Sequence, residues 1–141
     1  MKVLFLDVDG VLNSTRRAKA GFSYETLDPQ AIHWLQYIAA NNVSIVVSSS
    51  WRNHYTKEEL VKRLRVPVFG ITPWLRGPPR GTEIAVWLGQ HPSVDCYAII
   101  DDDNDMLPGQ QEHFVETDHE TGIQLQQLKA LCLLLDIPTP N

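Results

Sequence analysis

The sequence predicts an α/β fold in which a parallel sheet is flanked by helices. Three short runs, at residues 3–6, 43–47 and 97–100, are almost continuously apolar. Such runs are typical of strands that are buried on both faces of a parallel sheet. Patterns with helical spacing lie between them, and strands that alternate with helices predict right-handed parallel crossovers. Ligands bind such sheets at the carboxyl ends of the strands.

The composition predicts one globular domain over residues 1–141. The chain has 141 residues, of which 43% are hydrophobic and 21% charged, which argues against disorder or a fibrous repeat. Cys96 and Cys132 lack the spacing of a disulfide framework or a zinc site, so we expect free thiols and a cytoplasmic location. No apolar run is long enough to cross a membrane, and Asp7 interrupts the N-terminal run too early for a signal peptide.

The remaining elements follow from caps and apolar spacing. Asp28 and Pro29 have the form of an N-cap and a first helical turn, and apolar residues then recur as far as Ala39. Thr56 and Glu59 have capping-box spacing and predict a second helix. Less marked patterns predict helices at 83–88 and 125–135, short strands at 66–69 and 114–116, and a loop over 70–81.

Two carboxylates follow the first strand. Asp7 and Asp9 are two residues apart, and carboxylates so close repel each other unless a cation or a proton intervenes. Mg²⁺ suits an all-oxygen site of this kind. A calcium loop is excluded, since Leu12 and Ala18 stand where that loop needs glycine and glutamate. A solvated acidic turn is the other interpretation, but it does not explain why four buried apolar residues precede the pair.

Polar clusters also follow the other two strands. Asp101, Asp102, Asp103 and Asp105 follow the third run, and we expect one or two of them to bind metal and the rest to support the site or face solvent. The residues 48–52, with three serines and an arginine, follow the second run and offer hydroxyl, N–H and guanidinium donors for an anion.

In this order the clusters resemble the motifs of the haloacid dehalogenase (HAD) superfamily of aspartyl phosphotransferases. Asp7-Val8-Asp9-Gly10-Val11 matches the first motif, the strand that ends in Ser48–Ser49 the second, Arg80 the third, and Ile99-Ile100-Asp101-Asp102 the fourth. The finer pattern, with Ser49-Ser50-Trp51-Arg52 and Arg80-Gly81-Thr82-Glu83-Ile84, is similar to HAD domains of Swiss Army Knife RNA repair proteins. Polynucleotide phosphatase domains are similar in having arginine in the third motif.

The resemblance, which spans residues 3 to about 135, implies a three-layer Rossmann-like fold and Mg²⁺ as cofactor. It implies that Asp7 is the nucleophile and Asp9 the general acid and base. Mg²⁺ would be held by Asp7, the main-chain carbonyl of Asp9 and Asp102. Asp101 and Asp105 would orient these ligands.

The resemblance also implies a phosphate site. Ser49 would bind the phosphoryl group, with Ser48 as the open alternative, and Arg80 and Arg52 would offset its charge. Most of the superfamily has lysine where this chain has Arg80, and a guanidinium is not equivalent to an ammonium. Trp51 adjoins this site; we expect it to pack in the core, while stacking on a base stays an alternative.

The sequence predicts a site without a cap. Residues 14–27 and 53–79 are too short to hold an inserted domain, and an open site admits phosphates on large molecules. The leading hypothesis is a Mg²⁺-dependent phosphatase that acts on a phosphorylated substrate such as a nucleic-acid end or nucleotide. A noncatalytic binding module and a phosphotransferase are the alternatives. The net charge of −5 argues against nonspecific nucleic-acid binding but allows a local site.

Overall fold

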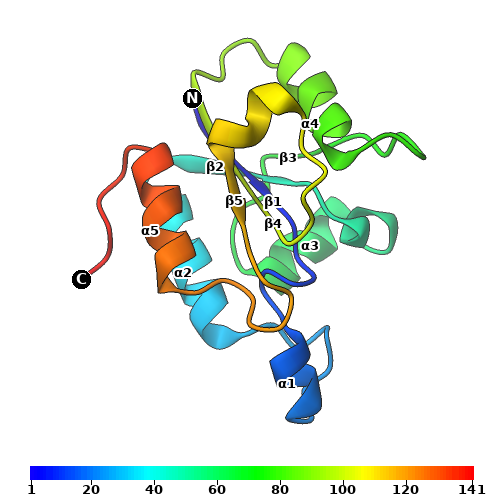
Figure 1. The fold of residues 1–141 in the computed structure, drawn as a ribbon, viewed down its shortest axis with the longest axis vertical. Helices are drawn as coiled ribbons and strands as arrows, with labels where there is room; N and C mark the ends of the chain where they lie inside the picture. Colours follow the sequence, from blue (N-terminus) through cyan, green and yellow to red (C-terminus); the bar gives the residue numbers. More distant parts are fainter.

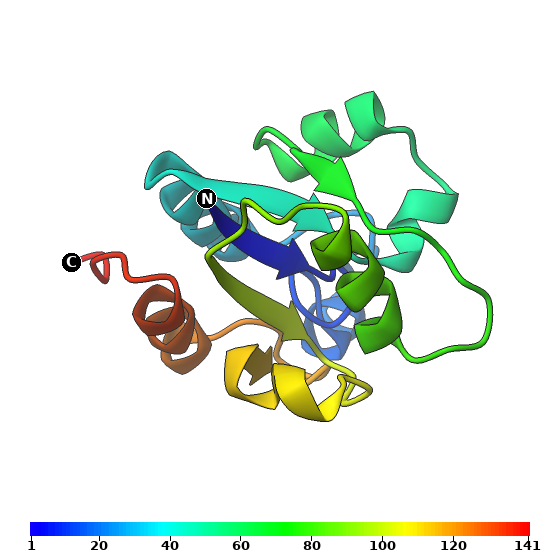
Figure 2. The ribbon, with the colours of Figure 1, turned by 90° about the horizontal axis from the view of Figure 1, so that it is seen from above.

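The structure is a computed structural model that describes residues 1–141, and its centre is a parallel sheet (Figures 1 and 2). The sheet has five strands in the order β3-β2-β1-β4-β5, and every neighbouring pair is parallel. The strands are β1 (Lys2–Leu6), β2 (Val43–Val47), β3 (Gly70–Ile71), β4 (Cys96–Asp101) and β5 (Phe114–Glu116). The predicted α/β fold is confirmed.

Helices connect the strands, and two of them, α2 and α3, begin at the predicted caps. The Asp28 carboxylate accepts a hydrogen bond from Gln30 N, and Thr56 and Glu59 form the predicted capping box. The α-helices are α1 (Thr15–Lys19), α2 (Pro29–Ala40), α3 (Lys57–Leu64), α4 (Arg80–Gly89) and α5 (Leu125–Leu134), with two 3₁₀ segments, η1 (Ser50–Asn53) and η2 (Pro108–His113). No helix has both the length and the apolar character that a membrane crossing requires.

Two apolar cores lie on opposite faces of the sheet, which gives three layers. On β1, Leu4 and Leu6 face the larger core, which contains the apolar residues of α2, α3 and α5. Val3 and Phe5 face the smaller core, where they meet Ile84 and Trp87 of α4. Because side chains alternate along a strand, Asp7, which follows Val3 and Phe5 in this alternation, also points to the side of α4.

The pairing register decides which residues meet at the carboxyl end of the sheet. Leu6 lies opposite Ile100 of β4. The register continues beyond the strands, because Asp7 N donates to Ile100 O (3.1 Å) and Ser48 N donates to Leu6 O (2.8 Å). Ser48, Asp7 and Asp101 therefore lie side by side at the carboxyl ends of β2, β1 and β4, which are adjacent in the sheet.

Three predictions about the fold need correction. Val66 and Val68 are buried, but their segment is not a strand, and the edge strand lies further on at Gly70–Ile71. The alternating apolar residues thus reflect packing into the core rather than sheet pairing. The predicted loop over 70–81 consequently contains β3 and the start of α4, which begins three residues before the predicted helix at 83–88.

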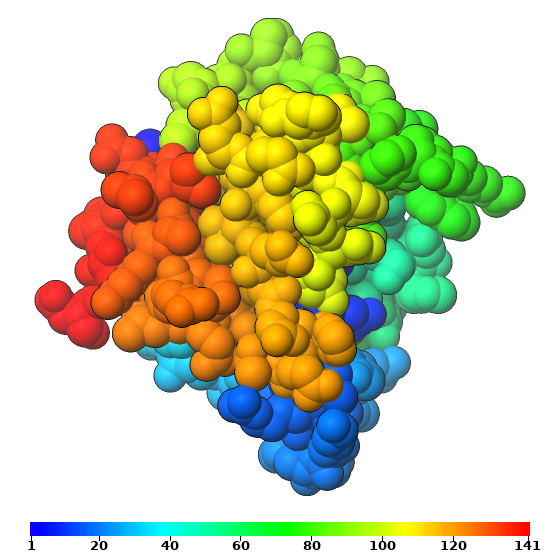
Figure 3. All heavy atoms as spheres, viewed as in Figure 1, coloured from blue at the N-terminus to red at the C-terminus, as the bar shows by residue number.

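Helix α1 was not predicted, and it extends the molecule beyond the carboxyl end of β1 (Figure 1). The start of α1 is tied to the segment after β5, since Thr15 N donates to His119 O (2.9 Å) and Arg16 N donates to Glu120 O (3.0 Å). Figure 3 shows this contact as blue spheres beside orange ones. Neither the β1–α2 connection nor the β2–α4 connection holds an inserted domain.

Candidate active site

Three adjacent strands bring Asp7, Ser48 and Asp101 together at the carboxyl end of the sheet. All three side chains are buried, and strand alternation directs them to the side on which α4 packs. Arg80, the first residue of α4, lies beside them. The sheet thus gathers into one group residues that are up to 94 positions apart in the chain.

The carboxylates at this point form a candidate metal site. Asp7, Asp101 and Asp102 each offer an oxygen atom, and these oxygens lie within 4.8 Å of one another. Gly10, at φ +80°, passes so close to the Asp102 carboxylate that a side chain would collide with it. Three carboxylates are a donor set that fits a hard divalent cation such as Mg²⁺. Asp101, predicted to orient the ligands, is itself a member of the cluster.

The electrostatics of the cluster also favour a cation. Burial is the largest cause that raises the pKa of Asp7 above its ordinary value, and Arg80 only partly opposes it. Burial, followed by repulsion from Asp7, raises the pKa of Asp101 as well. The two carboxyl groups therefore resist ionising together unless positive charge is added beside them.

Arg80 contacts two members of the carboxylate cluster, Asp7 and Asp101. Its Nη1 atom lies 3.3 Å from Asp7 Oδ1 and 3.2 Å from Asp101 Oδ2, and it also donates to the main-chain carbonyl of Ser48. The side chain keeps 22% of its surface exposed, so an anion can reach it. Asp105 fixes the start of α4 by accepting a hydrogen bond from Arg80 N (2.9 Å), and its support of the metal stays a prediction.

Arg52 does not join this group, and its guanidinium is paired with protein groups, which argues against the predicted contact with phosphate. Its side chain is 6% exposed, and its Nη2 donates to Glu83 Oε1 at 2.7 Å. Its Nη1 donates to Thr72 Oγ1 at 2.6 Å. The guanidinium is therefore held by buried partners from the residue after β3 and from α4, and its bond to Glu83 is charge-assisted.

Glu83 is a buried site-supporting residue that the sequence analysis missed. Besides Arg52, it accepts a hydrogen bond from Leu75 N at 2.8 Å and lies 3.9 Å from Nε of Arg80. Glu83 thus connects Arg52 to Arg80. The sequence did contain a signal for the contact between Glu83 and Arg80, because the two residues are three positions apart and share one face of α4.

The structure distinguishes the two candidate serines. Ser48 has a buried hydroxyl with no hydrogen-bond partner, and it lies in the row of Asp7 and Asp101. Ser49 follows in extended conformation, so its side chain points to the opposite side, where its oxygen accepts a hydrogen bond from Trp51 N at 3.2 Å and caps η1. Ser48 is therefore the better placed phosphate ligand, against the prediction for Ser49.

Asp9 is held by two donors that come from different segments. Its Oδ1 accepts hydrogen bonds from Trp51 Nε1 at 2.9 Å and from Asn13 Nδ2 at 2.8 Å. Asn13 is itself fixed, because its Oδ1 accepts from Gly10 N at 2.8 Å. Trp51 packs in the larger core as predicted, but it also orients the carboxylate, which the sequence analysis missed.

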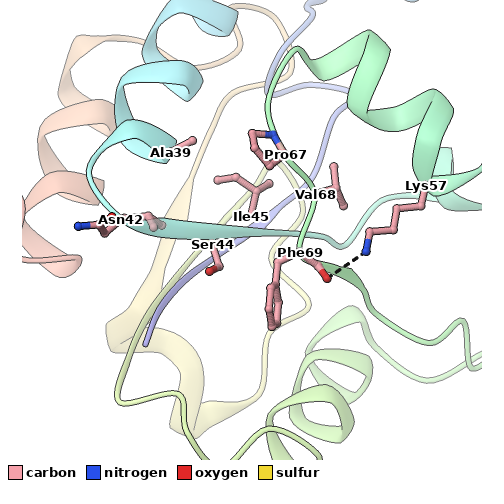
Figure 4. Close-up of a pocket in the computed structure, with 9 residues that line it drawn as sticks. Ala39, Asn42, Ser44, Ile45, Lys57, Pro67, Val68 and Phe69 are labelled. Atoms are coloured by element: carbon pink, nitrogen blue, oxygen red, sulfur yellow. Dashed lines mark hydrogen bonds between the residues drawn. The ribbon is translucent and has the colours of Figure 1, made fainter.

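Two hollows open beside Asp9 and share Tyr24. The first, of about 450 Å³, runs along Glu25, Trp51 and Tyr55. The second, of about 380 Å³, reaches Asp102 and His119. The largest cavity, of about 640 Å³, lies elsewhere, between the end of α2, β2 and residues 67–69 (Figure 4). Its lining holds no acidic residue, histidine or cysteine, so we do not assign chemistry to it.

The comparisons with known proteins agree with this geometry. The model of one protein family, described as the HAD domain in Swiss Army Knife RNA repair proteins, matches residues 3–128. The matched span contains every residue of the site described above. No curated protein and no solved structure matches the chain significantly.

Proposed function

The chain belongs to the family of HAD domains found in Swiss Army Knife RNA repair proteins, and we propose that it is a Mg²⁺-dependent phosphatase that hydrolyses phosphomonoesters. Family membership indicates a hydrolase of the phosphatase type. The observation that carries the finer proposal is the position of Asp7 between Arg80 and the cluster it forms with Asp101 and Asp102. This arrangement combines a nucleophile with the positive charge that a phosphoryl group needs.

In the first step, a carboxylate oxygen of Asp7 attacks the phosphorus atom of the substrate. A bond forms between that oxygen and phosphorus, the bond from phosphorus to the leaving oxygen breaks, and an aspartyl-phosphate results. Arg80 offsets the charge on the phosphoryl oxygens, and the unpartnered hydroxyl of Ser48 donates to one of them. The burial of Asp7 excludes water from this side of the phosphorus atom.

Asp9 moves the protons in both steps. Its Oδ1 accepts from two N–H groups that can only donate, those of Trp51 and Asn13. The proton that Asp9 transfers is therefore carried by Oδ2, from which it passes to the leaving oxygen. In the second step the same oxygen takes a proton from water as that water attacks phosphorus, which releases phosphate and regenerates Asp7.

The site has more carboxyl groups than guanidinium groups, and this excess of negative charge favours a divalent cation. Arg80 pairs with Asp7 and Asp101, and Arg52 pairs with Glu83, whereas Asp102 of the cluster forms no ion pair, so the carboxyl groups outnumber the guanidinium groups. Mg²⁺, when bound, would supply the missing positive charge and polarise the phosphoryl group. We propose that Asp7, Asp102 and the main-chain carbonyl of Asp9 hold it, with Asp101 beside them.

The proposed substrate is a phosphorylated nucleotide or nucleic-acid end. The open connections around the site support it, since nothing inserted there screens Asp9 from a bulky group. The exposed Arg76, packed on the ring of Trp74 at 5.1 Å, adds a cation and an aromatic side chain on the segment before α4. A cytoplasmic location is also proposed, and the unpaired Cys96 and Cys132 are consistent with it.

Hydrolysis of an aryl phosphate with and without Mg²⁺ tests the proposal. We expect turnover that requires the metal and is absent in Asp7→Asn, which keeps the size of the side chain. If the protein binds Mg²⁺ and phosphate but releases no product, it is a binding module. If product appears only when an alcohol is added as acceptor, it is a phosphotransferase.

A further inference from the structure

We propose that Tyr24 and Glu25 form a leaving-group subsite beside Asp9 that accepts a nucleoside and disfavours one that carries a second phosphate. This inference rests on the proposed function, because it assigns a place to the group that leaves when the phosphate ester is cleaved. It is carried by the juxtaposition of an unpartnered aromatic ring and an acidic side chain with spare acceptor sites, in one hollow that also contains Asp9.

The position of the leaving group follows from the geometry of substitution. The attacking and leaving oxygens lie on opposite sides of phosphorus, so the leaving group extends away from Asp7 and next to Asp9, which protonates it. Two hollows contain Asp9 in their lining. One of them also contains Asp102 and thus belongs to the metal side. The other, of about 450 Å³, extends along Tyr24 and Glu25 and is large enough for a nucleoside.

Tyr24 is the aromatic ring in this hollow that is free to stack. It is 45% exposed and makes none of the ring contacts that engage the other aromatic residues nearby. Tyr55 packs against Trp51 and lies under Arg63, while Phe22 lies under Arg17.

The backbone of Tyr24 is also fixed relative to Asp9. Its carbonyl accepts a hydrogen bond from Asn13 Nδ2 at 2.8 Å, and the same nitrogen donates to Asp9 Oδ1. The backbone of Tyr24 is therefore held near the carboxylate that meets the leaving oxygen, and its side chain lines the same hollow. A nucleobase can stack on such a ring, and stacking of this kind tolerates any base.

The charge of the hollow selects against a second phosphate. Glu25 and Asp9 both line it, and no lysine or arginine does. Glu25 accepts a hydrogen bond from Tyr55 Oη at 3.2 Å, and its remaining acceptor sites suit the hydroxyl groups of a sugar. A second phosphate on the same nucleoside would meet these two carboxyl groups, because the nearby guanidinium of Arg63 is engaged on the ring of Tyr55 and does not line the hollow.

The stacking half of the proposal is tested with Tyr24→Ala, Tyr24→Phe and the matched control Phe22→Ala. The readout is the ratio of kcat/KM for adenosine 5′-monophosphate to that for glycerol phosphate, which has no ring. We expect Tyr24→Ala to lower this ratio about tenfold, as the loss of one stacked base does, whereas Tyr24→Phe and Phe22→Ala retain it. An unchanged ratio in Tyr24→Ala, or an equal fall in Phe22→Ala, would overturn the subsite.

The charge half is tested with Glu25→Lys and the matched control Glu112→Lys, which makes the same charge change on the exposed surface of η2. The readout is the preference for adenosine 5′-monophosphate over adenosine 3′,5′-bisphosphate. We expect Glu25→Lys to reduce this preference about fivefold, and less at high salt, because the charges are exposed to solvent. A preference that Glu25→Lys leaves intact, or that Glu112→Lys shifts equally, contradicts the proposal.

Failure of the subsite and failure of the proposed function give different results. If aryl phosphate is hydrolysed but the two ratios do not respond, the subsite alone is wrong. If no phosphate is hydrolysed, the proposed function fails, and calorimetry with adenosine 5′-monophosphate then decides the subsite through the affinity lost in Tyr24→Ala. An oligonucleotide with a terminal phosphate carries a phosphodiester on that same nucleoside, so the subsite predicts that the free nucleotide is the better substrate, and a clear preference for the oligonucleotide would overturn the charge half of the proposal.

Discussion

The indole N–H of Trp51 donates a hydrogen bond of 2.9 Å to Oδ1 of Asp9. Trp51 belongs to η1, after β2, and is 5% exposed, whereas Asp9 follows β1 and is exposed to solvent. A rigid core residue thus holds the carboxylate that is proposed to transfer protons. This contact explains why an aromatic side chain with an N–H group stands at that position, where packing alone would accept phenylalanine.

Trp51→Phe should therefore impair proton transfer while the protein still folds. The variant removes one of two donors that orient the Asp9 carboxyl group, and we expect kcat for an alkyl phosphate to fall about tenfold. An aryl phosphate should lose less, because its leaving group needs little help from an acid. Steady-state kinetics with both substrates check this, and an equal loss for both would indicate a purely structural role.

Glu83→Gln should destabilise the fold strongly. Arg52 and Glu83 are 6% and 5% exposed, and removal of one partner of a buried ion pair costs about 3–5 kcal/mol in the free energy of unfolding. Glu120→Gln is the matched control, because Glu120 and Lys19 are 48% and 73% exposed and 3.9 Å apart. We expect that control to change stability by less than about 1 kcal/mol. Urea denaturation of both variants measures the difference.

Metal binding should stabilise the protein more at high pH than at low pH. The pKa values of Asp7 and Asp101 are raised by burial, so the metal-free fold retains protons that the unfolded chain releases above about pH 4. These groups therefore cost stability as pH rises. Mg²⁺ competes with those protons, and it should raise Tm more at pH 8 than at pH 5. A larger shift at pH 5 would show that these carboxylates do not bind the metal.

Asp102→Ala should raise the Mg²⁺ concentration needed for half-maximal activity about tenfold or more, as loss of a metal-supporting group does. Asp102 lies in the carboxylate cluster, whereas the next residue, Asp103, is exposed and lies outside it. Asp103→Ala is thus a control with the same chemistry, and we expect it to need nearly the wild-type concentration. Titration of activity with Mg²⁺ gives both values, and equal effects would mean that the assigned ligands are wrong.

The sequence predicted those parts of the fold whose signal is local. The apolar runs of β1, β2 and β4 are buried on both faces, and the caps at Asp28 and Thr56 use local hydrogen bonds. The edge strand β3 pairs through only two residues, too few for a pattern. Helix α1 has no buried residue and depends on its contacts with the segment after β5, so apolar periodicity could not reveal it.

The same distinction applies to the site. Asp7, Arg80, Asp101 and Asp102 were predicted and lie together, because each follows a strand or begins a helix at the same edge of the sheet. The role of Arg52 was not predictable, since its partner Glu83 is 31 residues away and meets it only after folding. The choice between Ser48 and Ser49 needed the pairing register, which decides the face to which each side chain points.

The most direct test of the account is whether phosphate becomes attached to Asp7. In Asp9→Asn, an aryl phosphate should still phosphorylate the protein, because its leaving group needs no acid, while water attack slows for want of a base. Acid quenching followed by mass spectrometry should then find one phosphoryl group on the peptide that contains Asp7, and none in Asp7→Asn. Turnover of aryl phosphate by the wild-type protein, with no phosphorylated Asp7 in either wild type or Asp9→Asn, would contradict the proposed mechanism.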